Sequence, residues 1–135
     1  MKIVLDTNCL IISIQEYSQR HWLWQAFRDE KIVLCYTNEV LSEYYEILSR
    51  YYSVLFADGV VEEILGAPNA IPVTVFYKWN LITADPDDNK FVDCAISANA
   101  KYIVSNDRHF KILESIDFPK VNISTMDEFK EIIQV

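Results

Sequence analysis

The stretch from Ala84 to Phe110 constrains the fold more than any other part of the chain. Asp85 fits the capping position of a helix and Pro86 fits its first turn, where the acidic residues that follow favour the positive end of the helix dipole. The apolar helical run ends before a short strand, Tyr102 to Val104, which is followed by Ser105-Asn106-Asp107. A carboxylate at the start of a helix and another at the end of the next strand can meet at one point, which is a first indication of a metal site.

The predicted helix presents its acidic residues on different faces. At about 100° per residue, the apolar residues between positions 91 and 98 form one stripe, and Asp88 lies about 10° from its centre. Asp93 falls on the far side of the helix, together with Asn89 and Ser97. We therefore expect Asp88, alone among these acids, to head the face that packs onto the core.

Apolar runs elsewhere alternate between strand-like and helix-like segments. Strands are expected at residues 2–5, 31–36, 71–75, 102–104 and 121–123. Helices are expected after the first strand through Ile14, then at residues 19–30, 38–52, 53–65, 85–98 and 107–113, and after Ser124 or Thr125. This alternation predicts an α/β protein, a three-layer α/β/α sandwich with a central, mostly parallel sheet of about five strands. One domain, residues 1–135, is expected from the length.

Composition excludes several classes of function. Only two glycines are present, so neither a P-loop nor a dinucleotide-binding fingerprint is possible. The three cysteines are scattered within apolar runs, which is typical of buried thiols in a reduced, cytoplasmic protein without a membrane segment. The net charge of −8 argues against a nonspecific nucleic-acid binder, unless bound cations neutralise part of the acidic count.

The same geometric reasoning selects acidic residues in other segments. Asp6 and Asp107 follow strands at their carboxyl ends, where sites form in parallel sheets. In the helix expected at residues 38–52, Glu43 lies about 115° from the centre of the apolar stripe and borders the buried seam. Glu39 and Glu46 lie about 155° and 175° away, so both should be solvated.

Four acids lie at a strand end or on or beside the buried face of a helix, namely Asp6, Glu43, Asp88 and Asp107. Placing them together without a cation would be costly, because nearby like charges raise one another's pKa. Mg²⁺ or Mn²⁺ would remove that cost, since hard divalent cations prefer oxygen ligands and keep some of their waters. Such ions can orient and deprotonate a water and stabilise phosphoryl oxygens, so no side-chain nucleophile is required.

Four short motifs occur in a familiar order, LDTN, SEYYEILSR, DPDDNKF and IVSNDRHF. In this order and spacing the chain resembles the PIN-domain ribonucleases, and most of all the VapC-like toxins of bacterial toxin–antitoxin pairs. The resemblance spans essentially the whole chain. It implies a metal-dependent endoribonuclease that hydrolyses RNA phosphodiester bonds, with Mg²⁺ or Mn²⁺ as cofactor, and a cytoplasmic homodimer blocked by a cognate antitoxin protein.

By the same resemblance, the catalytic and metal-ligating acids are Asp6, Glu43, Asp88 and Asp107. Asn8 and Ser105 match polar positions that support the cluster. The aspartate-rich start of the central helix leaves the third acid open, so that Asp85, Asp87 or Asp93 could contribute instead.

Other readings of these residues remain. The chain could be a catalytically inactive PIN-like module that binds RNA or protein. A phosphoryl-accepting receiver domain is disfavoured, because only one acid follows the first strand and no aspartate follows the third. His21 and His109 are expected to be surface or packing groups rather than ligands, and Lys90, Arg108 and Lys111 to be solvated rather than phosphate-binding.

Overall fold

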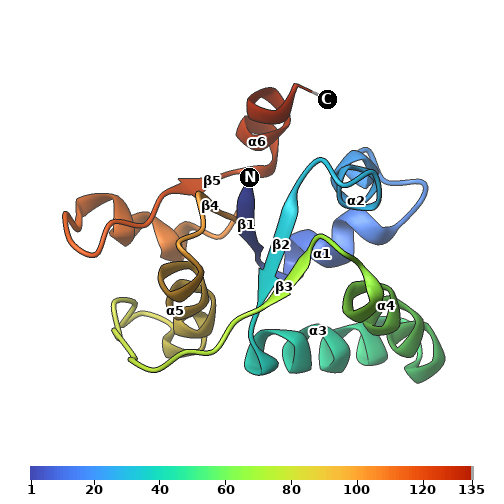
Figure 1. The fold of residues 1–135 in the computed structure, drawn as a ribbon, viewed down its shortest axis with the longest axis horizontal. Helices are drawn as coiled ribbons and strands as arrows, with labels where there is room; N and C mark the ends of the chain where they lie inside the picture. Colours follow the sequence, from blue (N-terminus) through green and yellow to red (C-terminus); the bar gives the residue numbers. More distant parts are fainter. Residues whose placement is uncertain (135) are drawn as a thin grey trace.

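The computed structural model describes residues 1–134, and within them five strands form one sheet in the order β3-β2-β1-β4-β5 (Figure 1). The strands are β1 (Lys2–Leu5), β2 (Val33–Tyr36), β3 (Ala70–Pro72), β4 (Tyr102–Val104) and β5 (Ile123–Ser124). All four pairings are parallel, so the carboxyl ends of the strands share one edge of the sheet. Val135, the last residue of the expected domain, lies outside the described residues.

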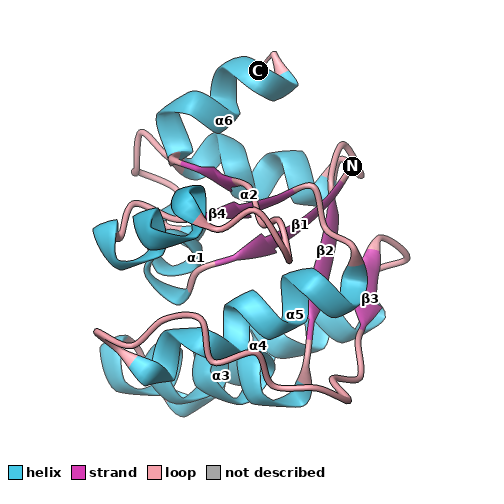
Figure 2. Ribbon diagram, turned by 90° about the vertical axis from the view of Figure 1, so that its left-hand side faces the viewer, coloured by secondary structure: helices cyan, strands magenta, loops and turns pink. Residues whose placement is uncertain are grey.

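Helices cover both faces of this sheet. The helices are α1 (Thr7–Ile14), α2 (His21–Arg28), α3 (Asn38–Tyr51), α4 (Val54–Gly66), α5 (Asn89–Ala98) and α6 (Met126–Ile133), with 3-10 segments η1 (Pro86–Asp88) and η2 (Arg108–Ser115). Figure 1 shows α5 on one side of the strands and α1, α2 and α4 on the other, and Figure 2 shows α6 and α3 at opposite ends of the molecule. The predicted three-layer sandwich is confirmed. None of the described helices combines the length and apolarity that a membrane span requires.

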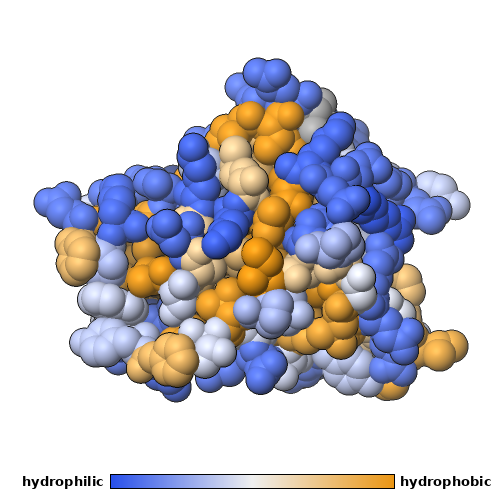
Figure 3. All heavy atoms as spheres, in the orientation of Figure 1, coloured by the Kyte–Doolittle hydropathy of each residue, from blue (hydrophilic) through white to orange (hydrophobic). Residues whose placement is uncertain are grey.

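The central strand β1 is enclosed on both faces, as its run of apolar residues requires. Ile3, Val4 and Leu5 are at most 3% exposed. The hydroxyl of Tyr44, which is fully buried on α3, donates a hydrogen bond to the backbone carbonyl of Leu5. This bond fixes α3 against the end of β1, directly before Asp6. Figure 3 shows hydrophobic residues reaching the surface in a band over the middle of the molecule, flanked by hydrophilic ones.

The side of α5 that lies opposite its apolar stripe is partly buried, although its residues are polar. Asn89 and Asp93 do point away from the apolar stripe, but both are buried, at 8% and 6% exposure. Asn89 accepts a hydrogen bond from the backbone N–H of Ile82 and donates one to its carbonyl, both at 2.9 Å. Asp93 accepts one from the backbone N–H of Trp79. The irregular segment 73–83 is therefore attached to α5 by polar side chains.

The third and fifth strands have shorter or shifted bounds compared with the sequence prediction. The strand expected at residues 71–75 ends at Pro72 in β3, an edge strand, where a proline is tolerated because no further strand needs its N–H. After the backbone N–H of Val73 donates to the carbonyl of Tyr36, the chain leaves the sheet and crosses α5. The strand expected at residues 121–123 pairs with β4 only at Ile123 and Ser124.

Removal of the Asn89 amide should loosen the segment that covers α5. The substitution Asn89→Ala leaves the N–H and C=O of Ile82 without their partner in a buried position, at a cost of about 1–3 kcal/mol in unfolding free energy. Urea denaturation would measure this, with Ser97→Ala on the exposed face of α5 as a control expected to stay within about 0.5 kcal/mol of the wild type. Equal stability of Asn89→Ala and the wild type would contradict the assignment.

Candidate active site

A cleft of about 500 Å³ opens at the edge of the sheet where the parallel strands end. Four separated chain segments line it, and carboxylates dominate its surface. The lining residues are Asp6, Thr7, Asn8, Glu43, Ile47, Arg50, Tyr51, Asp85, Asp87, Asp88 and Asp107. All four acids selected from the sequence thus face one cleft, with exposed Asn8 beside them.

Asp6 lies at the carboxyl end of β1 and is 6% exposed. Its Oδ2 accepts a hydrogen bond from the hydroxyl of Ser105 at 2.8 Å. The same hydroxyl accepts one from the backbone N–H of Asp107 at 3.0 Å. Buried Ser105 therefore links the acid at the end of β1 to the acid after β4, which is the position expected for it from the sequence.

Glu43 enters the cleft from α3 with both carboxylate oxygens already engaged. Oε2 accepts a hydrogen bond from the hydroxyl of Thr7, and Oε1 accepts one from the ammonium of Lys90 at 2.8 Å. Lys90 also pairs with Asp87 at 3.0 Å, and its side chain is only 15% exposed. The expectation that Lys90 is solvated is wrong, because α5 and α3 bring it against two carboxylates.

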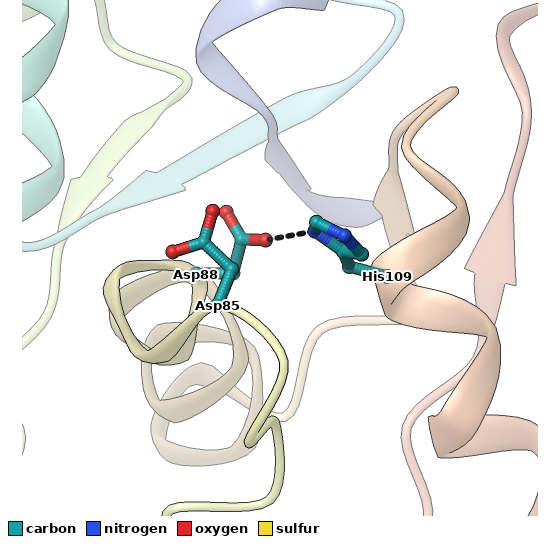
Figure 4. Close-up of side chains that lie close together, drawn as sticks. All are labelled: Asp85, Asp88 and His109. Carbon is teal, nitrogen blue, oxygen red and sulfur yellow. Dashed lines mark ion pairs between the residues drawn. The ribbon is translucent and has the colours of Figure 1, made fainter.

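Asp88 has the least compensated charge in the cleft. Its side chain is 13% exposed, and its Oδ2 is fully buried with no hydrogen-bond partner in the described part of the chain. The Nδ1 of His109 lies 3.5 Å from this oxygen and 3.5 Å from Oδ1 of Asp107. Figure 4 shows Asp85 and Asp88 side by side, with a dashed line from the Asp88 carboxylate to the imidazole of His109.

The three aspartates left open by the sequence have different surroundings. Asp85 contributes one oxygen that lies within 4.8 Å of ligand atoms on both Asp88 and His109. Asp87 lines the cleft but pairs with Lys90. Asp93 is bound to the backbone of Trp79 and does not line this cleft.

Burial and crowding shift the acid equilibria of the site. Burial raises the pKa of Asp6 to about 6, opposed by the hydrogen bond from Ser105 and assisted by the charge of Asp107. The pKa of Asp88 is also raised to about 6, first by burial and then by the charges of Asp85, Asp107 and Asp6. Asp87 behaves in the opposite way, because the hydrogen bond from Lys90 lowers its pKa.

These observations fit a divalent cation. The donor set is rich in carboxylate oxygens, as Mg²⁺ and Mn²⁺ require. Asp88 provides a buried oxygen without a partner, and a positive charge at that point would reverse the cost that raises the pKa of Asp6 and Asp88. Within the described residues, Asp85, Asp88 and His109 bring possible ligand atoms within 4.8 Å of one another, and Asp6 and Asp107 line the same cleft.

Three residues near the acids were not singled out as part of the site from the sequence. Thr7 immediately follows Asp6, and Lys90 lies one helical turn after Asp87, so adjacency and spacing are signals that point to both. His109 follows Asp107 by two residues, and its backbone N–H donates to the Asp107 carboxylate at 2.9 Å. That capping turn brings the imidazole, which is 43% exposed as expected for a surface group, to within 3.5 Å of Asp88 and Asp107.

Comparison with known families places the chain in one of them. The model of the PIN domain family matches residues 2–109. The chain belongs to the PIN domain family. A search of curated proteins gives no match to this PIN domain.

Solved structures share the fold of this PIN domain at low sequence identity. VapBC2 from Rickettsia felis, bound to a DNA fragment from its promoter, aligns with TM-score 0.65 and 19% identity over 93% of this chain and 98% of that chain. FitAB bound to the IR36 DNA fragment aligns with TM-score 0.56 and 13% identity, over 92% and 94%. The PIN domain endonuclease Utp24 aligns with TM-score 0.54 and 14% identity, over 92% and 84%.

Neutralising Asp88 should stabilise the protein when no divalent cation is available. Because the pKa is raised from 3.8 to about 6, the folded state disfavours the charged carboxylate above that pH. We expect Asp88→Asn to raise the unfolding free energy at pH 7 in EDTA by about 1–2 kcal/mol. The gain should disappear as the pH falls from about 6 toward 4, where folded Asp88 takes up a proton.

Denaturation curves across this pH range provide the measurement, and Asp87→Asn provides the control. The pKa of Asp87 is lowered, so its charge is favoured in the folded state and its neutralisation should bring no gain. A loss of stability in Asp88→Asn at pH 7 would contradict the description of Asp88 as an uncompensated buried charge.

Proposed function

We propose that this PIN domain is a divalent-metal-dependent endoribonuclease that acts as the toxin of a toxin–antitoxin pair. One observation carries the proposal, namely that Asp6, Asp88 and Asp107 come from three separate segments to one cleft where an oxygen of Asp88 is buried without a partner. The family match and the fold shared with the PIN domain endonuclease Utp24 support nuclease chemistry.

The residues of the cleft have separate roles in this proposal. Asp6, Asp88 and Asp107 hold Mg²⁺ or Mn²⁺, and the bound ion supplies the activation of a water and the neutralisation of phosphoryl oxygens. Ser105 orients Asp6 and Asp107 through its two hydrogen bonds. Because both oxygens of Glu43 already accept hydrogen bonds, its share in holding the ion is smaller than that of the three aspartates.

The outer part of the cleft suits a single-stranded nucleic acid. Arg50 and Tyr51 line it, and Tyr51 is 69% exposed. A guanidinium can contact phosphate and an exposed aromatic ring can stack on a base without sequence preference. These groups make RNA a suitable substrate despite the net charge of −8.

A protein partner fits the surface at the junction of α3 and α4. Tyr52, Val54, Leu55 and Phe56 are between 38% and 82% exposed there. Contiguous apolar residues on the surface of a soluble domain are typical of protein-binding sites. We assign this surface to a cognate antitoxin, by analogy with the neighbours VapBC2 and FitAB; the homodimer expected from the sequence stays a prediction.

A catalytically inactive PIN-like binding module is the second candidate, and one contact favours it. The ammonium of Lys90 lies 2.8 Å from Glu43 inside the acid cluster and neutralises part of it without a metal. In such a module, Asp6→Asn would leave RNA or protein binding intact and no cleavage would be found in any variant.

Purified protein should cleave a mixed RNA pool in Mg²⁺ or Mn²⁺, and EDTA should stop the reaction. Asp6→Asn and Asp88→Asn should each lower the cleavage rate at least about 100-fold, since each removes a charge that holds the ion. Glu43→Gln should lower it less. The rates would be measured by gel electrophoresis of labelled RNA.

Glu39→Gln is the matched control, because Glu39 lies on the same helix as Glu43 but is exposed and does not line the cleft. Its rate should equal that of the wild type. Cleavage that survives EDTA or Asp88→Asn would exclude the proposed chemistry, and complete inactivity of the wild type would favour the binding module.

A further inference from the structure

An imidazole lies among the carboxylates of the cleft. His109 is the second residue of η2, which begins directly after Asp107. Its side chain is 43% exposed. Its Nδ1 is 3.5 Å from Oδ2 of Asp88 and 3.5 Å from Oδ1 of Asp107. One ligand atom from each of Asp85, Asp88 and His109 lies within 4.8 Å of the other two.

The position of His109 is fixed by the backbone and by its neighbour. The backbone N–H of His109 donates to the carboxylate of Asp107 at 2.9 Å, which forms the turn that begins η2. Phe110 is fully buried and packs edge-on against Phe91 of α5, with ring centroids 6.4 Å apart. Since Phe91 lies three residues after Asp88, this contact ties the imidazole to the start of α5.

The contact between His109 and Asp88 leaves the buried oxygen of Asp88 without a hydrogen bond within residues 1–134. Nδ1 of His109 and Oδ2 of Asp88 are 3.5 Å apart, and this oxygen has no hydrogen-bond partner among the described residues. Two ligands bound at right angles about 2.1 Å from one ion lie about 3 Å apart, so small side-chain movements would let one ion contact both atoms.

We propose that His109 supplies a nitrogen ligand, through Nδ1, to the divalent cation held by Asp88, and that Asp85 supplies a further oxygen. This inference rests on the metal site of the proposed function and extends it beyond the four acids selected from the sequence. It also predicts which divalent cation the site prefers. Imidazole suits first-row transition metals, whereas Mg²⁺ prefers oxygen and water, so the site selects Mn²⁺ over Mg²⁺.

The competing explanation is that protonated His109 is itself the counter-charge of Asp88 and Asp107. An imidazolium would then occupy the place of a cation, and divalent ions would compete with its proton. In that case a bound Mn²⁺ ion would have no nitrogen neighbour. The two explanations therefore differ in one spectroscopic signal.

The sequence makes that signal unusually easy to assign. The chain has two histidines, and His21 lies away from the cleft, where its Nδ1 contacts the backbone carbonyl of Ser13 at 2.8 Å. In untagged His21→Asn protein, any imidazole nitrogen coupled to bound Mn²⁺ must belong to His109. Pulsed electron paramagnetic resonance of this variant should detect that coupling, and it should vanish in the double variant His21→Asn/His109→Asn.

Calorimetric titration supplies the second measurement. We expect His109→Asn to weaken Mn²⁺ binding at least about tenfold while Mg²⁺ binding changes less than about threefold, and His21→Asn to change neither. Labelling wild-type protein with ¹⁵N-histidine should change the nitrogen coupling without any substitution, which guards against a folding defect in the variants.

Mn²⁺ bound to His21→Asn protein without an imidazole coupling would overturn the inference, as would equal Mn²⁺ affinities of His109→Asn and wild type. Neither result bears on RNA cleavage in Mg²⁺, which is measured separately. The nuclease proposal would fail instead if wild-type protein bound Mn²⁺ with the imidazole coupling and cleaved no RNA.

Discussion

Mutual repulsion between carboxylates at one edge of the sheet is the constraint on which the rest of the structure depends. Parallel strands end side by side, so the acids that follow them are forced together, and helices α3 and η1–α5 add more from either side. The protein compensates this charge unevenly. Ser105 supports Asp6, and Thr7 with Lys90 supports Glu43, while Asp88 keeps a buried oxygen without a partner.

Rigid packing around the cleft explains how such a cluster persists. The Tyr44 hydroxyl bonds the last residue of β1, the Asn89 amide holds the segment that covers α5, and the contact of Phe91 with Phe110 joins α5 to η2. Each contact lies within a few residues of an acid in the cleft. Packing in the core thus stabilises the fold against the repulsion between the acids. This combination is typical of sites that bind a charged ligand.

The fold could be predicted from the sequence because its signals are local and mutually consistent. Alternating apolar runs gave the parallel sheet, and helical spacing separated Glu43 from the solvated Glu39 and Glu46. Pro72 and Asn89 show the limits of this reasoning. The end of β3 and the cover over α5 depend on which segment lies at the sheet edge and which polar side chain meets an unpaired backbone, and neither is a property of one segment.

The site also combines features set by one segment with features set by contacts between segments. Asp6, Asp88 and Asp107 are found from strand ends and from one helix face, which are periodic features. Lys90 contacts Glu43 because α5 packs beside α3, and His109 lies near Asp88 because a capping turn follows Asp107. The sequence contains these residues next to the acids, but their direction is set by tertiary contacts.

In the proposed function, a bound cation completes this arrangement of charges in the PIN domain. Anomalous X-ray scattering from crystals soaked in Mn²⁺ tests this most directly. The account predicts an anomalous peak between the carboxylates of Asp6, Asp88 and Asp107. Crystals that bind Mn²⁺ elsewhere, with no peak in this cleft at saturating concentration, would contradict it.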